Sequence, residues 1–310
     1  MTTQPSSDLS QLSGVLPFMM DSTERKALLR GRLARVDAVA SSILARHDYP
    51  QAVAELSAES IALAACLSST MDFDGVFTLQ AKGDRDVGTL FADVTSEGAV
   101  RAYAQIADDF DAATPLGDPA PLMTLMGIGY LAFTVDQGEN GRYQGIVPIE
   151  DPDLNAVAMR YFYNSEQLDT ALLLAARPDG QGGWQAASLM LQRIPETGGN
   201  NVTKPFSDED DDLWHTACTL MATCTRDELV DATLSGEDLL HRLFHELDVS
   251  ILPFRPMVDQ CRCSPERVER MLASLPDDEK RDLADDDQII TVSCEFCKKD
   301  HKIKLSIFEG

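Results

Sequence analysis

Four cysteines near the C-terminus constrain the fold of this chain more than any other feature. They form two close pairs, Cys261-Arg262-Cys263 and Cys294-Glu295-Phe296-Cys297, with thirty residues between them. Two close thiol pairs separated by a short module are typical of a tetrahedral zinc site with four thiolate ligands. Either pair can also close into a local disulfide, so the same sulfur atoms can hold a metal when reduced and release it when oxidised. The pattern predicts a redox switch, with a zinc ribbon that never changes state as the alternative.

The segment that carries these cysteines predicts a small module with little core of its own. A helix is expected directly after Cys263, because Ser264 is a good N-cap and Pro265 suits the first helical position. Two strands, over Ile289–Ser293 and Lys302–Ile307, are expected on either side of the second cysteine pair. Because the module has few large apolar residues, we expect it to be unfolded, or nearly so, without its metal.

Two alternative uses of residues in this module are less favoured. His301 lies four residues after Cys297, but the four cysteines already complete a tetrahedral set. A thioredoxin-like function for Cys294 and Cys297 needs the pair at the start of a helix, whereas a strand is predicted before it. No convincing nucleophile–base pair is evident, so the sequence gives no case for an enzyme.

Other clusters of polar residues are expected to be exposed. His241 and His245 are four residues apart but lack the HExxH pattern, so we expect them on the solvent-facing side of a helix. The aspartate runs at 208–212 and 285–287 lack the spacing and the glycine of a calcium loop. We interpret both runs as solvated helix ends.

Residues 23–195 predict an α+β domain with a mostly antiparallel sheet packed with helices. Helices are expected over Asp37–Arg46, Ala52–Ser69 and Asp153–Glu166. Strands are expected over Arg32–Val36, Phe77–Gln80, Gly88–Thr95, Ala99–Gln105, Tyr130–Val135, Tyr143–Ile149, Ala171–Ala176 and Trp184–Ile194. Residues 1–22, in which Pro17 interrupts a short apolar stretch, are expected to be a flexible tail.

Residues 196–255 predict a helical linker, and residues 256–310 the cysteine module. The acidic run that follows Ser207 is a good helix start, and Ser235 with Asp238 resembles a second one. The linker helices have an apolar face but only a modest core, so we expect them to lie on the α+β domain.

Composition limits the compartment and the partners. The formal net charge is -25, with 51 acidic and 26 basic residues, which disfavours nucleic acid as a partner. The N-terminus does not have the features of a signal peptide, and no run approaches the roughly 18 apolar residues of a membrane span. Seven cysteines are too few for a secreted disulfide framework, and Cys66 fits a buried small hydrophobe. We therefore expect a cytoplasmic protein without a membrane partner.

The cysteine pattern, with Cys-Arg-Cys-Ser-Pro-Glu-Arg at its first pair, resembles that of the redox-regulated heat-shock protein 33 chaperones. The resemblance covers about residues 25–305. Further matches are Arg30-Gly31-Arg32, His47-Asp48-Tyr49-Pro50, Phe73-Asp74-Gly75, Leu79-Gln80, Tyr143-Gln144-Gly145-Ile146-Val147, Tyr161-Phe162, Ser165-Glu166-Gln167 and Leu243-Phe244-His245-Glu246.

The resemblance implies a cytoplasmic holdase that uses no ATP and binds unfolding proteins under oxidative stress. In the reduced state one zinc ion per chain is bound by Cys261, Cys263, Cys294 and Cys297, and the protein is inactive. Oxidation forms the disulfides Cys261–Cys263 and Cys294–Cys297, releases zinc and unfolds the module and the linker. The oxidised form is a homodimer that captures client proteins.

Two features affect the details of this interpretation. Cys218 and Cys224 lie in the predicted linker, where extra thiols can join the oxidation chemistry. Apolar surface for clients is expected near Tyr130–Val135 or Leu239–Leu247, although both segments also fit an ordinary core. A thiol–disulfide oxidoreductase and a static zinc-ribbon interaction protein remain the alternative functions.

Overall fold

The computed structural model describes residues 13–22, 28–110, 122–195 and 205–308. It divides into two compact units, Met1–Asp259 and Gln260–Gly310. The predicted α+β class is confirmed, with antiparallel sheets, helices and a C-terminal cluster of four cysteines. Residues 1–12 of the predicted tail and 196–204 of the predicted linker lie outside the described residues.

The first sheet of the N-terminal unit has the strand order β10-β1-β2-β9-β8, and a short strand, β11, also pairs with β1. Its strands are β1 Gly14–Met20, β2 Leu29–Arg35, β8 Thr170–Pro178, β9 Trp184–Arg193, β10 Val249–Ile251 and β11 Arg255–Pro256. All of its pairings are antiparallel. Strand β8 ends this order, so one of its edges pairs with no other strand of the described residues.

Strand β1 corrects the prediction of a flexible tail up to residue 22. Pro17 suggested an irregular segment, because proline cannot donate to a strand ladder. In the structure β10 pairs with Phe18–Met20 and β11 with Gly14 and Val15, so the flanking strand is interrupted beside Pro17. The carbonyl of Pro17 accepts a hydrogen bond from Leu252 N on that side. The missing N–H therefore falls where no ladder bond is required.

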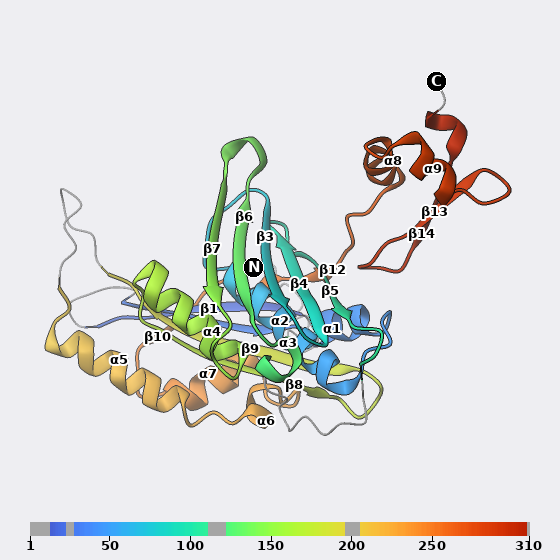
Figure 1. Cartoon of the computed structure of the whole chain (residues 1–310). Coiled ribbons are helices and arrows are strands. Elements are labelled where there is room, and N and C mark those ends of the chain that lie inside the picture. The colour runs from blue at the N-terminus through green and yellow to red at the C-terminus, as the bar shows by residue number, and fades with distance from the viewer. Residues whose placement is uncertain (1–12, 23–27, 111–121, 196–204, 309–310) are drawn as a thin grey trace, which may run out of the picture. The chain divides into compact units, whose positions relative to one another are not determined.

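The second sheet has the order β12-β5-β4-β3-β6-β7. Its strands are β3 Val76–Gly83, β4 Val87–Thr95, β5 Ala99–Ile106, β6 Gly129–Asp136, β7 Arg142–Pro148 and β12 Val258–Asp259. Strands β3 to β7 pair antiparallel, and only the two-residue strand β12 runs parallel to its neighbour β5. Figure 1 shows β3 to β7 as the upright strands from blue to green.

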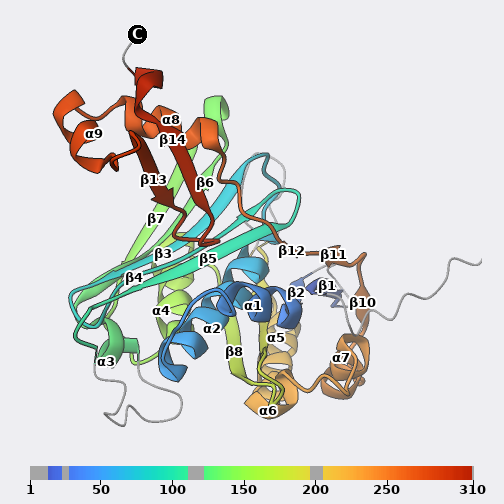
Figure 2. The same ribbon diagram turned by 90° about the vertical axis from the view of Figure 1, so that its right-hand side faces the viewer.

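Two helices, α1 Asp37–Leu44 and α2 Gln51–Ser68, lie between the two sheets (Figure 2). Helix α2 is buried on nearly all sides, and its side chains join those of both sheets in one core cluster. The short helix α3 spans Leu122–Met126. Helix α4, Leu154–Tyr161, continues as a π-helical turn over Phe162–Glu166, which together account for the helix predicted over Asp153–Glu166.

The linker helices lie on the opposite face of the first sheet (Figure 2). They are α5 Asp208–Met221, α6 Arg226–Leu229 and α7 Gly236–Phe244. Ser207 and Ser235 cap α5 and α7 as the sequence predicted. After α7 the chain adds β10 and β11 to the first sheet and β12 to the second. The linker is therefore paired with both sheets before the second unit begins.

The C-terminal unit is built from two helices and one hairpin. Helix α8 spans Pro265–Ala273, α9 spans Asp277–Leu283, and strands β13 Ile289–Ser293 and β14 Asp300–Lys304 pair antiparallel. The second predicted strand begins two residues earlier than expected and ends three residues earlier, because Leu305–Phe308 form a 3-10 turn. The buried core of this unit consists of Val268, Leu272, Ile290, Ile303 and Leu305.

Candidate metal centre

The first cysteine pair precedes helix α8. Ser264 caps this helix by accepting a hydrogen bond from Arg267 N at 3.3 Å, and Pro265 occupies its first turn, as the sequence predicted. The side chain of Arg267 reaches back and donates to the carbonyl of Arg262 at 2.8 Å. These contacts fix the backbone that runs from Cys261 to Cys263.

The second cysteine pair occupies the turn between β13 and β14. Cys294 N donates to Lys299 O at 2.9 Å, and Lys298 N donates to Cys294 O at 2.8 Å. Lys298 has a φ of 57°, the left-handed conformation that closes this turn. The turn therefore places Cys294 and Cys297 on one side of the hairpin end.

The four sulfur atoms meet in one cluster. All four Sγ atoms lie within 4.8 Å of one another. Cys261 Sγ lies 3.7 Å from Cys294 Sγ, and Cys263 Sγ lies 3.5 Å from Cys297 Sγ. Zinc–sulfur bonds of about 2.3 Å in a tetrahedron place the sulfurs about 3.8 Å apart, so the observed edges fit this ion. A disulfide needs about 2.0 Å, and each of the seven cysteines is a free thiol in the structure.

The environment affects the thiols unequally. Burial raises the pKa of the Cys261 and Cys263 thiols above the ordinary value. Burial also acts to raise the pKa of Cys294, but its sulfur accepts hydrogen bonds from the backbone N–H groups of Cys297 and Phe296. Together with the neighbouring thiols, these bonds hold the pKa of Cys294 below the ordinary value. A thiolate is thus favoured at Cys294, while Cys261 and Cys263 need a nearby cation to ionise readily.

His301 is not part of this cluster. It is 3% exposed and pairs in register with Val292 on the neighbouring strand. Its Nε2 atom has no hydrogen-bond partner among the described residues. The four-ligand set assembled in the structure consists of cysteines alone.

The three remaining thiols are protonated near neutral pH. Burial raises the pKa of Cys66, Cys218 and Cys224 to about 11 in each case. Cys66 is fully buried, which confirms its interpretation as a small hydrophobe. Because the thiolate is the reactive form, Cys218 and Cys224 are poor first targets for an oxidant while the linker is folded.

The linker covers an apolar face of the first sheet. Leu239, Leu240, Leu243 and Phe244 of α7 are buried against that face, whose strands contribute residues such as Phe18. The sheet segment Tyr130–Val135, the other expected client surface, is almost wholly buried. Tyr130 is 41% exposed, while all residues from Leu131 to Val135 are buried.

Polar contacts that fasten the linker were not predicted. Arg193 Nη2 lies 2.5 Å from Asp211 Oδ1, and Arg177 Nη1 lies 2.6 Å from Asp227 Oδ1. Asp210, interpreted as part of a solvated helix end, is fully buried, which corrects that interpretation. These partners are far apart in the sequence and follow no periodicity, so no local signal identifies them.

His241 on α7 and His245, which directly follows the helix, are both exposed, as expected. Their ring centroids are 6.3 Å apart. Asp285 to Asp287 are likewise exposed at the surface, and Asp285 accepts a hydrogen bond from Ile289 N at 2.8 Å. Within the described residues, none of the helices combines the length and apolar character that crossing a membrane requires.

Comparison with known proteins identifies the family. The Hsp33 protein family model matches residues 17–304. The 33 kDa chaperonin of Caulobacter vibrioides (strain NA1000 / CB15N) is 35% identical over 302 residues, which cover 96% of this chain and 98% of the relative. The chain belongs to the Hsp33 family. The 33 kDa chaperonin of Pseudomonas aeruginosa (strain UCBPP-PA14) is also 35% identical, over 91% of this chain and 88% of that protein.

A solved Hsp33 structure has the same fold. The crystal structure of the 33 kDa chaperonin (heat shock protein 33 homolog) of Thermotoga maritima superimposes with a TM-score of 0.78 and 18% sequence identity, covering 96% of this chain and 97% of that one. Hsp33 proteins are chaperones rather than enzymes, so this chain is a chaperone. The predicted family resemblance is confirmed.

Proposed function

We propose that this Hsp33 protein is a redox-regulated holdase that uses no ATP and protects unfolding proteins under oxidative stress. The observation that supports the proposal is the cluster of four cysteine Sγ atoms within 4.8 Å of one another. In the reduced protein Cys261, Cys263, Cys294 and Cys297 are the ligands of one zinc ion per chain. Bound zinc supplies a structural cross-link between the two cysteine pairs and offsets half of the negative charge of their four thiolates.

Oxidation acts on the ligands themselves, because thiolates react with oxidants faster than thiols do. The disulfides formed are Cys261–Cys263 and Cys294–Cys297. Each pair of thiolates gives two electrons to the oxidant and forms one S–S bond. With hypochlorous acid as the oxidant, chloride and hydroxide are the other products. Once the sulfurs are bonded to each other, they no longer hold the ion.

Loss of the metal removes the main support of the C-terminal unit, which has only five buried apolar residues in its core cluster. A structural zinc contributes about 10–16 kcal/mol to the folding of small finger modules. Unfolding of this unit frees the end of the linker, whose helices lie on the first sheet through apolar side chains. The sheet face and the apolar faces of α5 and α7 then bind unfolded segments of client proteins. The active form is a cytoplasmic homodimer.

The decisive experiment follows zinc release and suppression of client aggregation in the same sample as reduced protein meets hypochlorite. One zinc per chain should leave as the activity appears, and a reductant should reverse the thiol oxidation. The Cys218→Ser variant is the matched control, because it removes a thiol outside the cluster and should behave like the unaltered protein. Zinc that stays bound, or leaves without any gain in client protection, identifies a static zinc ribbon instead.

A further inference from the structure

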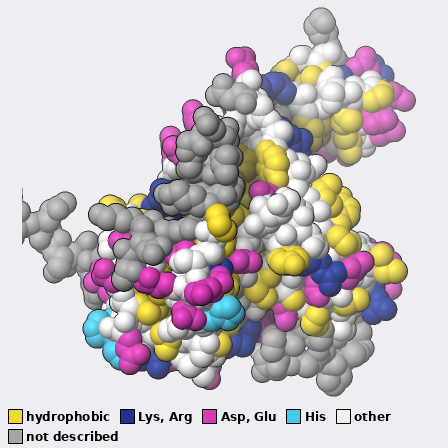
Figure 3. Space-filling view, turned by 90° about the vertical axis from the view of Figure 1, so that its left-hand side faces the viewer, with side chains coloured by type: hydrophobic (Ala, Val, Ile, Leu, Met, Phe, Trp, Pro, Cys, Tyr) yellow, Lys and Arg dark blue, Asp and Glu magenta, His cyan; other side chains and the backbone are white. Residues whose placement is uncertain are grey.

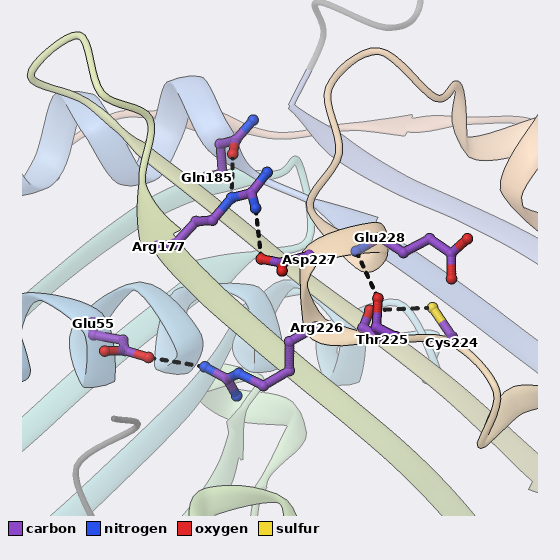
Figure 4. A network of polar contacts seen from close by, with 8 residues as sticks. All are labelled: Glu55, Arg177, Gln185, Cys224, Thr225, Arg226, Asp227 and Glu228. Carbon is purple, nitrogen blue, oxygen red and sulfur yellow. Dashed lines mark hydrogen bonds and ion pairs between the residues drawn. The ribbon is translucent and has the colours of Figure 1, made fainter. Parts of the chain in front are cut away.

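The guanidinium of Arg226 occupies a site made by the N-terminal unit. Arg226 is the first residue of α6 in the linker. Its Nη2 atom lies 2.9 Å from Glu55 Oε1, and its Nη1 atom lies 2.9 Å from Glu59 Oε1. Nη1 also donates to the carbonyl of Leu174 at 2.9 Å. Figure 4 shows Arg226 extending from the linker toward Glu55 on α2.

Together these three acceptor groups form a preformed binding site for a planar cation. Glu55 and Glu59 are one turn apart on α2, and their side chains are only 12% and 11% exposed. The carbonyl of Leu174 belongs to β8, the strand that ends its sheet. A guanidinium can donate to several acceptors through its rigid fork, whereas an ammonium is a point charge without that geometry.

The acceptors depend on a cation. Burial raises the pKa of the Glu59 carboxyl, although the neighbouring Arg226 acts to lower it. The Glu59 carboxylate, whose side chain is 11% exposed, would be costly without a cation, because an uncompensated charge in such a place is poorly solvated. When the linker leaves, the site is therefore left with a strong preference for another cation.

We propose that Glu55, Glu59 and the carbonyl of Leu174 form a binding site for arginine side chains of client proteins, which Arg226 occupies in the closed form. This inference rests on the proposed function, because the linker must leave the sheet before a client can enter. In the closed form Arg226 fills the place that a client arginine would take, and the site becomes accessible when Arg226 leaves with the linker.

The surroundings favour clients that carry arginine beside apolar residues. On β8, Leu173 and Ala175 flank Leu174 and pack with the apolar cluster that the linker covers. An extended client segment lying on that face can place apolar side chains on the sheet and an arginine at its edge. The formal net charge of -25 also attracts basic segments. Acidic side chains are spread over the described surface in Figure 3.

Chemical rescue tests the site in the reduced, zinc-loaded protein. Arg226→Ala should make protease cleavage within residues 205–255 about tenfold faster, because the linker opens more often. Millimolar methylguanidinium should restore the slow cleavage, and methylammonium should not. Arg160→Ala is the matched control, since Arg160 also pairs with two carboxylates, Glu150 and Asp151, away from the linker. Absence of any rescue specific to guanidinium overturns the proposed site.

Client preference tests the site in the oxidised full chain. The probes are two fluorescent apolar peptides that differ only in a central arginine or its neutral isostere citrulline. The unaltered protein should bind the arginine peptide about tenfold more tightly, and the Glu55→Gln/Glu59→Gln variant should bind both equally. Asp108→Asn/Asp109→Asn, with the same charge change at two exposed residues, should keep the preference.

The outcomes separate this inference from the proposed function. Equal binding of both peptides by the unaltered protein overturns the arginine site alone. A preference for the arginine peptide that persists in the Glu55→Gln/Glu59→Gln variant also overturns the arginine site. Failure of the oxidised protein to bind either peptide contradicts the holdase function and the arginine site together.

Discussion

Asp210 is a single carboxylate on which the start of the linker depends. Its side chain is fully buried and accepts hydrogen bonds from Ser207 N at 2.9 Å and from Ser22 Oγ at 3.1 Å. Asp210→Ala removes both acceptors and half of the capping box, so we expect α5 to lose about 1–2 kcal/mol of local stability. Hydrogen exchange of the α5 amides measures this loss. Asp212→Ala, in the same run but exposed, is the control and should change little.

The linker thiols provide a prediction on pH. Burial, with a smaller contribution from Asp169, raises the pKa of Cys218 to about 11. At pH 8 only about one molecule in a thousand then carries the thiolate, and this fraction grows tenfold per pH unit until the pKa is reached. The alkylation rate of Cys218 in the reduced, zinc-bound protein should therefore keep rising about tenfold per unit from pH 7 to 9. Mass spectrometry measures the rate, and a plateau below pH 9 would contradict the raised pKa.

At the residue scale, the features that could be predicted from the sequence are those set by residues close together in the chain. The spacing of Cys261, Cys263, Cys294 and Cys297 indicated their convergence, and Ser264 with Pro265 indicated the start of α8. The contact between Arg226 and Glu55 spans 171 positions. Charged residues at such positions look like solvent-facing ones in a sequence, because only the tertiary fold determines that they become buried.

Strand β12 shows how a very short element is held by a side chain. Only Val258 and Asp259 pair with β5. Asp259 accepts hydrogen bonds from Arg46 Nη2 at 2.9 Å and from Ser42 Oγ at 2.6 Å, both on or beside α1. Burial acts to raise the pKa of Asp259, but the bonds from Arg46 and Ser42 hold it below its usual value.

Asp259→Asn should loosen this strand at neutral pH. Loss of the charged acceptor is expected to destabilise β12 by about 1–2 kcal/mol, which speeds exchange of the Val258 amide about tenfold. The same loss is expected in the unaltered protein on acidification. Since the folded pKa is depressed, the contribution is present above the unfolded value of about 3.9 and disappears as pH falls through the lower folded value. Asp248→Asn, at an exposed position, should leave exchange of that amide unchanged.

At the scale of elements, periodicity predicted the long strands and helices but not the short additions to the sheets. Strands β10, β11 and β12 have three, two and two residues, too few to carry a pattern. Strand β1 was missed for another reason, because Pro17 argues against a central strand unless the neighbouring strand is interrupted. That interruption comes from residues more than 230 positions away, where Leu252 follows β10.

The two units of the molecule differ in what stabilises them, and this difference predicts the order in which they unfold. The N-terminal unit has large apolar clusters on both faces of its first sheet, whereas the C-terminal unit has one small cluster around Leu272 and Ile290. Burial of so little apolar surface cannot offset the conformational entropy of an ordered chain, so under the proposed function we expect a metal bound by the four cysteines to supply the remaining stability.

Chelation of zinc from the reduced protein should therefore unfold residues 260–310 while the two sheets of the N-terminal unit stay protected. Limited proteolysis is expected to cut first within residues 260–310 and to leave a resistant fragment that ends near Asp259. Hydrogen exchange should show the β13–β14 ladder losing protection and the β3–β4 ladder keeping it, and added zinc should restore both protection and resistance. If β13 and β14 remain protected without metal, their own packing stabilises the unit, and oxidation of the four thiols would then lack the means to release the linker.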